Sequence, residues 1–206
     1  MKICRIFAGG DIGSKCIKVN KDDLVICADG GYAAALKMGI VPDLIVGDFD
    51  SYSGELPENI EILRSIPEKD DTDTLLAIKT AIDRRASTII IYGAMGGRFD
   101  HTFANIQCLS YIHGHGCTGF IEDDNNIITL CGMGEHRFPY IKGWYFSVFA
   151  LTDTAHIESM TGVKYPLSDY PMTGSFPIGV SNEITDLEAV LKIKSGLALI
   201  VRSRRL

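Results

Sequence analysis

Short apolar runs alternate with helix-like stretches over the first part of the chain. Most of these runs are continuously apolar, and glycine or aspartate follows several of them directly. Residues 72–83 place Leu75, Leu76, Ile78 and Ile82 at helical spacing, which predicts a helix with one apolar face. Strands are expected over residues 3–8, 24–28, 44–46, 60–66, 88–92 and 118–121, and further helices over 32–38 and 101–112. Continuously apolar strands separated by helices indicate a parallel sheet that is covered on both faces.

The pattern changes near Asn125. From there on, short strand-like runs lie close together and are separated by glycine, proline, serine and aspartate, without a helix pattern of useful length. The runs are residues 127–130, 144–150, 189–193 and 197–201. This pattern favours a small all-β domain, a sandwich or a partial barrel. We therefore predict a Rossmann-like α/β domain over residues 1–125, followed by a β-sandwich domain over residues 126–206.

Composition narrows the classes of partner. The chain is 46% hydrophobic and has a formal net charge of −6, so it can bury a core, and nucleic-acid phosphates would repel it. Three arginines near the end, Arg202, Arg204 and Arg205, are expected to be a solvated terminus. No apolar run approaches the roughly 20 residues of a membrane span. We expect a cytoplasmic protein without nucleic-acid or membrane partners.

The six cysteines do not suggest a metal or redox site. None of them forms a Cys-x-x-Cys pair, and several lie inside apolar runs. Small buried thiols in a reducing compartment are the expected state of Cys4, Cys16, Cys27, Cys108, Cys117 and Cys131. The histidines His113, His115, His136 and His156 show no metal-ligand spacing and are expected to be surface or structural residues.

Polar residues follow the carboxyl ends of several predicted strands, where open α/β sheets form their ligand crevice. In Gly47-Asp48-Phe49-Asp50-Ser51, the two aspartates can share one hard cation such as Mg²⁺, or Asp50 can cap a turn. Asp70-Asp71-Thr72-Asp73 precedes a predicted helix. Asp71 or Thr72 can cap that helix, but capping explains only one of three clustered acids. Together the two motifs favour a magnesium site.

A glycine-rich segment, residues 93–97, comes just before Arg98 and another predicted helix. Glycines permit close approach of the backbone to phosphate, and Arg98 can bind a phosphate through two hydrogen bonds. Asp100 can cap the helix or face a substrate. Neither Gly-x-Gly-x-x-Gly nor a Walker-type motif is present, which disfavours dinucleotide and P-loop sites.

The order of these motifs resembles that of thiamine pyrophosphokinases. The matching segments are Ala28-Asp29-Gly30-Gly31, Pro42 to Ser51, Lys69 to Asp73, and Gly96 to His101. In the second half, Thr161 to Leu167 and Gly179 to Glu183 resemble segments that lie near thiamine in the family. Tyr165 stands where animal and fungal members carry tryptophan.

The resemblance implies an α/β domain joined to a β-sandwich, and a homodimer that binds thiamine between the two kinds of domain. It also implies transfer of a diphosphate from ATP to the hydroxyl of thiamine, which leaves AMP. Mg²⁺ would be held by Asp48, Asp50 and Asp73, with Asp70 as a further contributor. The residues bordering ATP would be Asp29, Gly30, Gly31, Ser51, Thr72 and Arg98, and those near thiamine would be Asp100, Tyr165, Ser181 and Asn182.

Two alternatives use the same motifs. A related pyrophosphokinase could act on a pterin alcohol, although the Tyr165 and Ser181-Asn182 segments favour thiamine. A non-catalytic nucleotide or thiamine sensor would not need so many clustered carboxylates, each of which costs stability without a cation. We therefore expect catalysis to depend on Asp48, Asp50, Asp73, Arg98 and Asp100.

Overall fold

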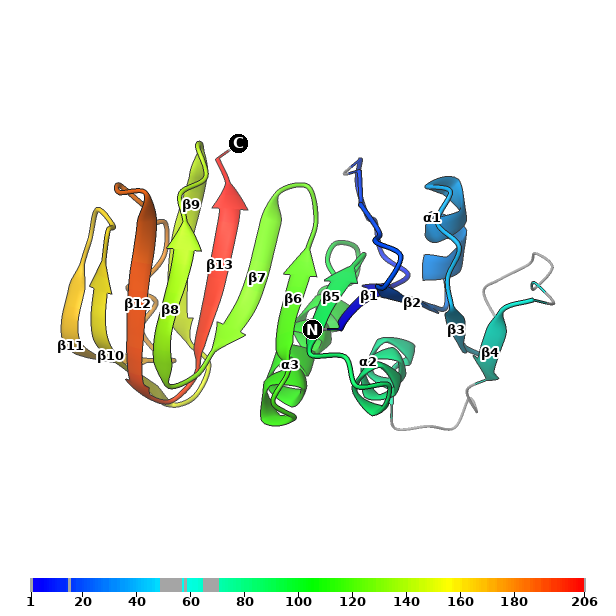
Figure 1. Ribbon diagram of the computed structural model, residues 1–206. Coiled ribbons are helices and arrows are strands. Elements are labelled where there is room, and N and C mark those ends of the chain that lie inside the picture. Colours follow the sequence, from blue (N-terminus) through cyan, green and yellow to red (C-terminus); the bar gives the residue numbers. More distant parts are fainter. Residues whose placement is uncertain (1, 15, 49–56, 58, 65–70, 206) are drawn as a thin grey trace. The chain divides into compact units, whose positions relative to one another are not determined.

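The computed structural model describes residues 2–14, 16–48, 57, 59–64 and 71–205, and it divides the chain into two compact units between Asp124 and Asn125 (Figure 1). The first unit is a parallel α/β unit and the second is an antiparallel β-sandwich. This confirms the predicted fold class. Within the described residues, no helix is long and apolar enough to cross a membrane.

The first unit contains a parallel sheet in the order β4-β3-β2-β1-β5-β6. Its strands are β1 (Ile3–Phe7), β2 (Leu24–Ala28), β3 (Leu44–Gly47), β4 (Glu61–Arg64), β5 (Thr88–Tyr92) and β6 (Thr118–Glu122). The chain runs outward from β1 to β4 and then returns to β5 on the other side of β1. The strand order therefore reverses between β1 and β5, where sheets of this kind open a ligand crevice.

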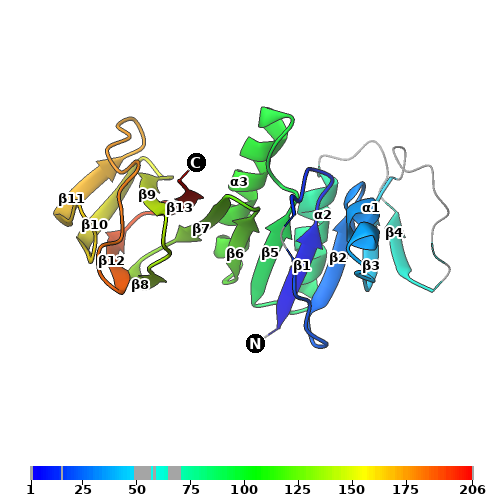
Figure 2. The same cartoon turned by 90° about the horizontal axis from the view of Figure 1, so that it is seen from above.

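In the described part of this unit, three helices cover the sheet: α1 (Gly31–Lys37), α2 (Asp73–Asp83) and α3 (Phe99–Gly114). Figures 1 and 2 show α1 on one face and α2 and α3 on the other. Because both faces are covered, β2 is buried at all of its residues, which explains its continuously apolar sequence. The helices start close to their expected positions, and Thr72 caps α2 by accepting a hydrogen bond from the Leu75 amide at 3.2 Å.

The second unit packs two antiparallel sheets. One has the order β7-β13-β9, with β7 (Asn126–Cys131), β13 (Ala198–Arg204) and β9 (Trp144–Ala150). The other has the order β11-β10-β12-β8, with β11 (Leu167–Thr173), β10 (Thr154–Thr161), β12 (Glu188–Ser195) and β8 (Gly134–Pro139). Phe146, Ile157, Leu191 and Ile200 belong to the core cluster of this unit. Strands β8, β10 and β11 were not expected from the sequence.

The prediction of a solvated arginine terminus is wrong for Arg202, whereas Arg204 and Arg205 are exposed as expected. Arg202 lies in β13, which pairs with strands on both sides, and only 8% of the residue is exposed. Its Nη2 donates to the carbonyl oxygen of Pro139 at 2.6 Å, and burial lowers the pKa of Arg202 from its ordinary value. Arg205, just beyond the strand, forms an ion pair with Glu183. Arg202 and Arg205 are therefore both held by contacts within the second unit.

The cysteine prediction holds for four of the six thiols. Cys4, Cys27, Cys108 and Cys131 are buried, and burial raises the pKa of Cys4 and of Cys27 to about 12. Cys16 is exposed and Cys117 is partly exposed, so the expectation was wrong for these two. All six are free thiols. The buried ones behave as small apolar residues of the core.

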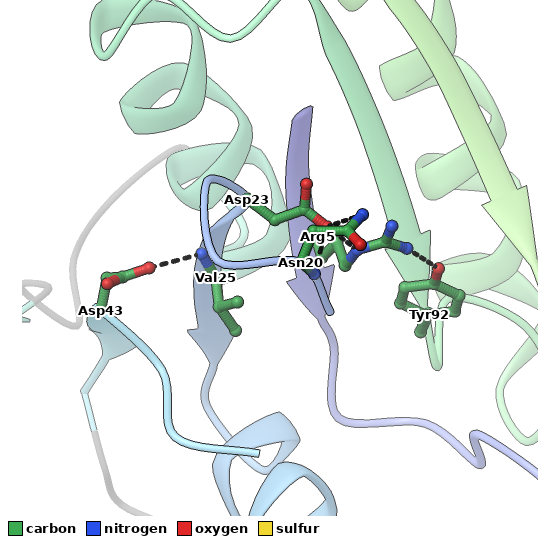
Figure 3. Close-up of polar contacts among 6 residues, drawn as sticks. All are labelled: Arg5, Asn20, Asp23, Val25, Asp43 and Tyr92. Atoms are coloured by element: carbon green, nitrogen blue, oxygen red, sulfur yellow. Dashed lines mark hydrogen bonds and ion pairs between the residues drawn. The ribbon is translucent and has the colours of Figure 1, made fainter. Parts of the chain in front are cut away.

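One ion pair is nearly buried against the parallel sheet (Figure 3). Nε of Arg5 lies 2.6 Å from Oδ2 of Asp23, and the two side chains are only 12% and 6% exposed. Nη1 of Arg5 also donates to the hydroxyl of Tyr92 at 2.8 Å. The backbone amide of Asn20 donates to Asp23 at 3.1 Å. These contacts fix the turn that leads into β2 to the two strands at the centre of the sheet.

Candidate functional site

A cavity of about 470 Å³ opens at the carboxyl ends of β1, β2 and β5. Its lining comes from the residues that follow these strands and from the starts of α2 and α3. Among the predicted site residues, Asp29, Thr72, Asp73 and Arg98 all line it. The other lining residues are Ala8, Gly9, Gly10, Ala28, Thr74, Gly93, Ala94, Gly96, Gly97, His101 and Asn105. The structure thus brings together four residues that are up to 69 positions apart in the sequence.

Two glycine segments form one side of this cavity. The amide of Gly10 donates to the carbonyl oxygen of Gly93 at 2.9 Å, so the loops after β1 and β5 are joined. A Cβ atom on Gly10 would lie 2.5 Å from that oxygen, and Gly93 has a φ of +66°, so neither position tolerates a side chain. Asn105 of α3 is buried and donates to the carbonyl oxygen of Ala94 at 2.8 Å, which holds the second loop against the helix. Bare backbone therefore faces the cavity.

Asp29 occupies an unusual position at the end of β2. Its φ is +45°, a left-handed conformation that is costly for a residue other than glycine. Its amide is held by the carbonyl oxygen of Val46 at 2.8 Å. Oδ1 is buried and has no hydrogen-bond partner within the described part of the chain. A strained backbone and an unsatisfied carboxylate oxygen are features that functional sites retain.

The acids before α2 have different environments. Asp71 forms an ion pair with Lys79 of α2, with Oδ2 2.5 Å from Nζ. Thr72 is the N-cap, as one alternative from the sequence predicted, and Asp73 begins the helix and lines the cavity. A carboxylate in the first turn of a helix is stabilised by the helix dipole. Of the two acids of this motif that the structure describes, Asp71 is paired with Lys79 and Asp73 lines the cavity.

Arg98 and Asp100 lie at the start of α3 and pair with each other. The alternative in which Asp100 caps this helix is wrong, because α3 begins at Phe99 and its N-cap is Arg98, without a side-chain capping bond. Asp100 accepts hydrogen bonds from the Arg98 side chain and from the His101 amide. The hydrogen bond from Arg98 is the main reason that the pKa of Asp100 lies below its ordinary value. Arg98 lines the cavity, and Asp100, two positions further along, is held to it by their hydrogen bonds.

The predicted magnesium set is described only in part. Asp48 follows β3 and is partly buried, whereas Asp50, Ser51 and Asp70 lie outside the described residues. Among the described residues alone, no group of three or more acids, histidines or cysteines is arranged to hold a metal ion. Asp29 and Asp73 line the same cavity, and Oδ1 of Asp29 lacks a hydrogen-bond partner among the described residues. Carboxylate oxygens of this kind suit Mg²⁺, which retains waters and phosphate oxygens as its other ligands.

A second cavity, of about 730 Å³, lies between the loop after β1 and helix α1. It shares Gly9 and Gly10 with the first cavity, so the two adjoin. Apolar residues line part of it, namely Ile12, Ile17, Ala33, Ala34 and Met38. Sequence reasoning assigned no role to Gly9 and Gly10. Their position directly after a buried strand was the available signal.

The second unit carries the other predicted site residues. Tyr165 is 60% exposed, whereas Asn182 is only 4% exposed. Ser181 has a φ of +57°, and its amide donates to Oγ of Ser147 at 3.0 Å. Lys164 places its ammonium 5.5 Å from the centre of the Tyr165 ring. Exposed aromatic surface and nearby backbone turns are thus grouped in the segments 164–165 and 181–182.

The fold and the first cavity define a class of protein: an α/β unit with a glycine-rich, carboxylate-bearing crevice suited to phosphates and a cation, followed by a β-sandwich. Comparison with known proteins identifies the family. The model of the thiamin pyrophosphokinase catalytic domain matches residues 17–121, and that of the thiamin pyrophosphokinase vitamin B1 binding domain matches residues 135–198. The chain belongs to the thiamine pyrophosphokinase family, as the sequence motifs predicted, and is a thiamine diphosphokinase.

Individual relatives agree with this assignment. The thiamine pyrophosphokinase of Bacillus subtilis is 30% identical over 98% of this chain and 99% of its own length. The crystal structure of the thiamine pyrophosphokinase from Bacillus subtilis matches with a TM-score of 0.89 at 27% identity, over 100% of both chains. A thiamin pyrophosphokinase family protein from Enterococcus faecalis matches with a TM-score of 0.85 at 28% identity, again over 100% of both chains. These matches favour the thiamine enzyme over the pterin and sensor alternatives.

Proposed function

We propose that this enzyme transfers a diphosphate group from ATP to the hydroxyl of thiamine, with release of AMP, and that the reaction requires Mg²⁺. The observation that carries the proposal is the convergence of Asp29, Asp73 and Arg98 on one glycine-lined cavity at the switch point of the sheet. Such a cavity offers the two things that diphosphate transfer needs. It can hold the reacting groups in fixed positions, and it can place positive charge against the phosphates. The catalytic set is Asp48, Asp50, Asp73, Arg98 and Asp100.

The phosphate chain of ATP would lie along the first cavity. Backbone amides of the glycine segments and the start of α3 favour anions there, and Arg98 can bind phosphate oxygens through two nitrogens. Asp48, Asp50 and Asp73 would hold Mg²⁺, with Asp70 as a further ligand. The bound cation would neutralise the triphosphate charge during transfer. Thr72, Ser51, Gly30 and Gly31 would border the nucleotide, as would Asp29.

The second cavity is suited to the nucleoside part of ATP. Its volume of about 730 Å³ is within the usual range for small-ligand sites, and it adjoins the phosphate cavity at Gly9 and Gly10. Its apolar wall, which includes Ile12, Ile17 and Met38, offers a surface for a purine ring. Asp29, next to Gly30 at the edge of this cavity, can accept a hydrogen bond from a ribose hydroxyl.

The acceptor would be bound by the β-sandwich. Residues 1–125 then form the nucleotide- and metal-binding catalytic domain, and residues 126–206 form the thiamine-binding domain. The exposed ring of Tyr165 can attract the cationic thiamine by about 0.5–2 kcal/mol. Ser181 would also border thiamine, and Asp100 would contact thiamine or its hydroxyl. The enzyme would work in the cytoplasm as a homodimer, with each site formed between two subunits.

The activity is tested by incubating the protein with ATP, MgCl₂ and thiamine and identifying the products by mass spectrometry. AMP with thiamine diphosphate supports the proposal. ADP with thiamine monophosphate would mean that the enzyme transfers a single phosphate and not the proposed diphosphate. Turnover of a pterin alcohol in preference to thiamine would favour the related enzyme. Thiamine binding without turnover would favour the sensor.

The shared site is tested at low thiamine by mixing two variants under conditions in which subunits exchange. Asp73→Asn should have lost turnover, and Tyr165→Ala should have little activity at that thiamine concentration because it binds thiamine more weakly. If the α/β unit of one subunit works with the β-sandwich of another, each mixed dimer contains one intact site. An equal mixture should then regain about a quarter of wild-type activity at low thiamine, because half of the dimers are mixed and each has one working site of two. A mixture that stays inactive would place both residues in a site made by one chain.

A further inference from the structure

The side chain of Asn182 holds the backbone of Tyr165 at both of its polar groups. Oδ1 of Asn182 accepts a hydrogen bond from the Tyr165 amide at 3.0 Å, and Nδ2 donates to the Tyr165 carbonyl oxygen at 2.9 Å. A carboxamide bound in this way takes the place of a peptide group in a strand pair. Asn182 is only 4% exposed, whereas Tyr165 is 60% exposed. A buried side chain thus anchors the backbone of an exposed aromatic residue.

Asn182 itself is fixed from the other side. The backbone carbonyl oxygen of Asn182 accepts a hydrogen bond from the backbone amide of Phe146 at 2.8 Å, and the two residues form an isolated antiparallel bridge. Phe146 is fully buried in the sandwich core. The residue before Tyr165 is tied to the same segment, since the Lys164 amide donates to the carbonyl oxygen of Glu183 at 2.9 Å. The backbone of Tyr165 is therefore connected to the core by hydrogen bonds, through Asn182 to the buried Phe146.

The hydrogen-bonding capacity of Asn182 leaves little for a substrate. Oδ1 also accepts from the amide of Glu183 at 2.9 Å, so both of its lone pairs are used inside the protein. One of the two Nδ2 hydrogens is used as well. A residue that is buried and engaged in this way is poorly placed to recognise thiamine directly.

We infer that Asn182 is a positioning residue, which acts on the acceptor by holding Tyr165 rather than by touching thiamine; this rests on the proposed function. Without the two hydrogen bonds, the Tyr165 backbone would have to be ordered by the substrate itself, at the expense of affinity. The ammonium of Lys164 occupies one side of the ring, 5.5 Å from its centre, and is paired with Glu183. The cationic acceptor would use the side of the ring that Lys164 leaves free.

A double-mutant cycle tests this inference. Asn182→Ala, Tyr165→Ala and the double variant are compared with wild type by their KM for thiamine, KM for ATP and kcat. Asn182→Ala should raise the thiamine KM about five- to tenfold and leave the ATP KM unchanged. In the Tyr165→Ala background, the same change should have almost no further effect, because no ring remains to be positioned.

Two further variants separate positioning from general damage. Asn182→Asp keeps the size and the acceptor oxygens of the side chain but loses the hydrogen-bond donor to the Tyr165 carbonyl oxygen, so it should also raise the thiamine KM. If Asn182→Ala does not fold, Asn182→Asp takes its place in the cycle. Thr152→Val is the matched control, since Oγ1 of Thr152 also makes two backbone hydrogen bonds in this unit, to the Thr154 carbonyl oxygen at 2.8 Å and from the Leu197 amide at 3.0 Å. Thr152→Val should lower the melting temperature without changing the thiamine KM.

The inference is overturned if Asn182→Ala raises the thiamine KM equally with and without the Tyr165 ring, because Asn182 then contacts thiamine itself. It is also overturned if Thr152→Val raises the thiamine KM as much as Asn182→Ala does. A wild-type enzyme that does not turn over thiamine would refute the proposed function instead. The cycle would then be measured as thiamine affinity by calorimetry, with the same pattern expected.

Discussion

The guanidinium of Arg98 contacts both carboxylate oxygens of Asp100, with Nε 3.1 Å from Oδ1 and Nη2 2.5 Å from Oδ2. Both side chains are largely exposed, at 72% and 63%. The hydrogen bond between them raises the pKa of Arg98 and lowers that of Asp100 from their ordinary values, so both remain charged. A phosphate that binds Arg98 must therefore take the place of Asp100 or share the guanidinium with it.

Removal of this arginine should impair catalysis without unfolding the protein. We expect Arg98→Ala to lower kcat/KM for ATP by on the order of 100-fold, as loss of a charged donor at a transferring phosphate does elsewhere. Arg98→Lys should recover only part of the activity, because an ammonium cannot reproduce two parallel hydrogen bonds. Steady-state kinetics at saturating thiamine provide the measurement. Wild-type kinetics for Arg98→Ala would exclude Arg98 from the site.

The matched control for Arg98 is Arg137 in the β-sandwich. Its guanidinium also pairs with acids on the surface, Glu135 at 2.7 Å and Glu188. Arg137→Ala should leave kcat/KM for ATP unchanged. A loss equal to that of Arg98→Ala would mean that the assay reports general surface charge rather than phosphate binding.

Asp73 provides the test of the metal assignment. We expect Asp73→Asn to lower kcat by at least about 100-fold and to shift half-maximal activation to higher MgCl₂, because an amide oxygen is a poorer ligand for a hard cation. Activity is measured across a MgCl₂ titration, and Asp48→Asn should behave in the same way. Asp83→Asn, at the other end of α2, is the control and should retain wild-type activation. Normal rates for Asp73→Asn at all MgCl₂ concentrations would refute the assignment.

Gly31 has a packing role that its motif does not reveal. A Cβ atom at Gly31 would lie 1.9 Å from the carbonyl oxygen of Phe7, so α1 sits directly on the end of β1. Gly31→Ala should destabilise the protein by about 2 kcal/mol or more, because backbone must move. Gly114→Ala, where nothing lies within 4 Å, should instead stabilise it by about 0.5–1 kcal/mol. Thermal unfolding compares the two, and equal melting temperatures would contradict this role.

The sequence predicted the first unit well because its strands are buried on both faces. Continuous apolar runs gave the bounds of β2 and β5 as the structure has them. In the second unit, β8 has the sequence GEHRFP with one buried residue, and β10 has register irregularities around Ile157, so neither shows a clean alternation. Arg202 was misjudged for a related reason, since charge near the end of a chain does not reveal that the strand is central.

The candidate site was predictable at residues that follow buried strands or begin helices, such as Asp29, Asp73 and Arg98. The contributions that were missed are made through backbone or through another residue. Gly10 acts by the close contact of its loop with Gly93. Asn182, which the sequence placed near thiamine, acts by accepting a hydrogen bond from the Tyr165 amide and donating one to the Tyr165 carbonyl oxygen. Such roles depend on which segments meet in space, and a single sequence does not record that.

The buried pair of Arg5 and Asp23 predicts a large effect on stability. Asp23→Asn removes one charge of a pair whose side chains are 12% and 6% exposed, and should lower the free energy of unfolding by about 3 kcal/mol at pH 7. Asp43→Asn is the control from the same region, shown in Figure 3: its oxygen accepts from the Val25 amide at 2.8 Å, which an amide side chain can also do. That change should cost less than about 1 kcal/mol. Urea unfolding measures both.

The same pair sets the pH range over which this stabilisation is present. Burial alone raises the pKa of Asp23, but hydrogen bonds from Arg5 and Asn20 outweigh it, so its pKa in the folded protein lies below the ordinary value. A carboxylate with a lowered pKa contributes its full stabilisation above the unfolded value of about 3.9 and loses it as the pH falls further. The stability difference between wild type and Asp23→Asn should thus be constant from about pH 5 to 8 and shrink below about pH 4. Urea unfolding at pH 3, 4, 5 and 7 tests this, and a difference as large at pH 3 as at pH 7 would show that charge is not its source.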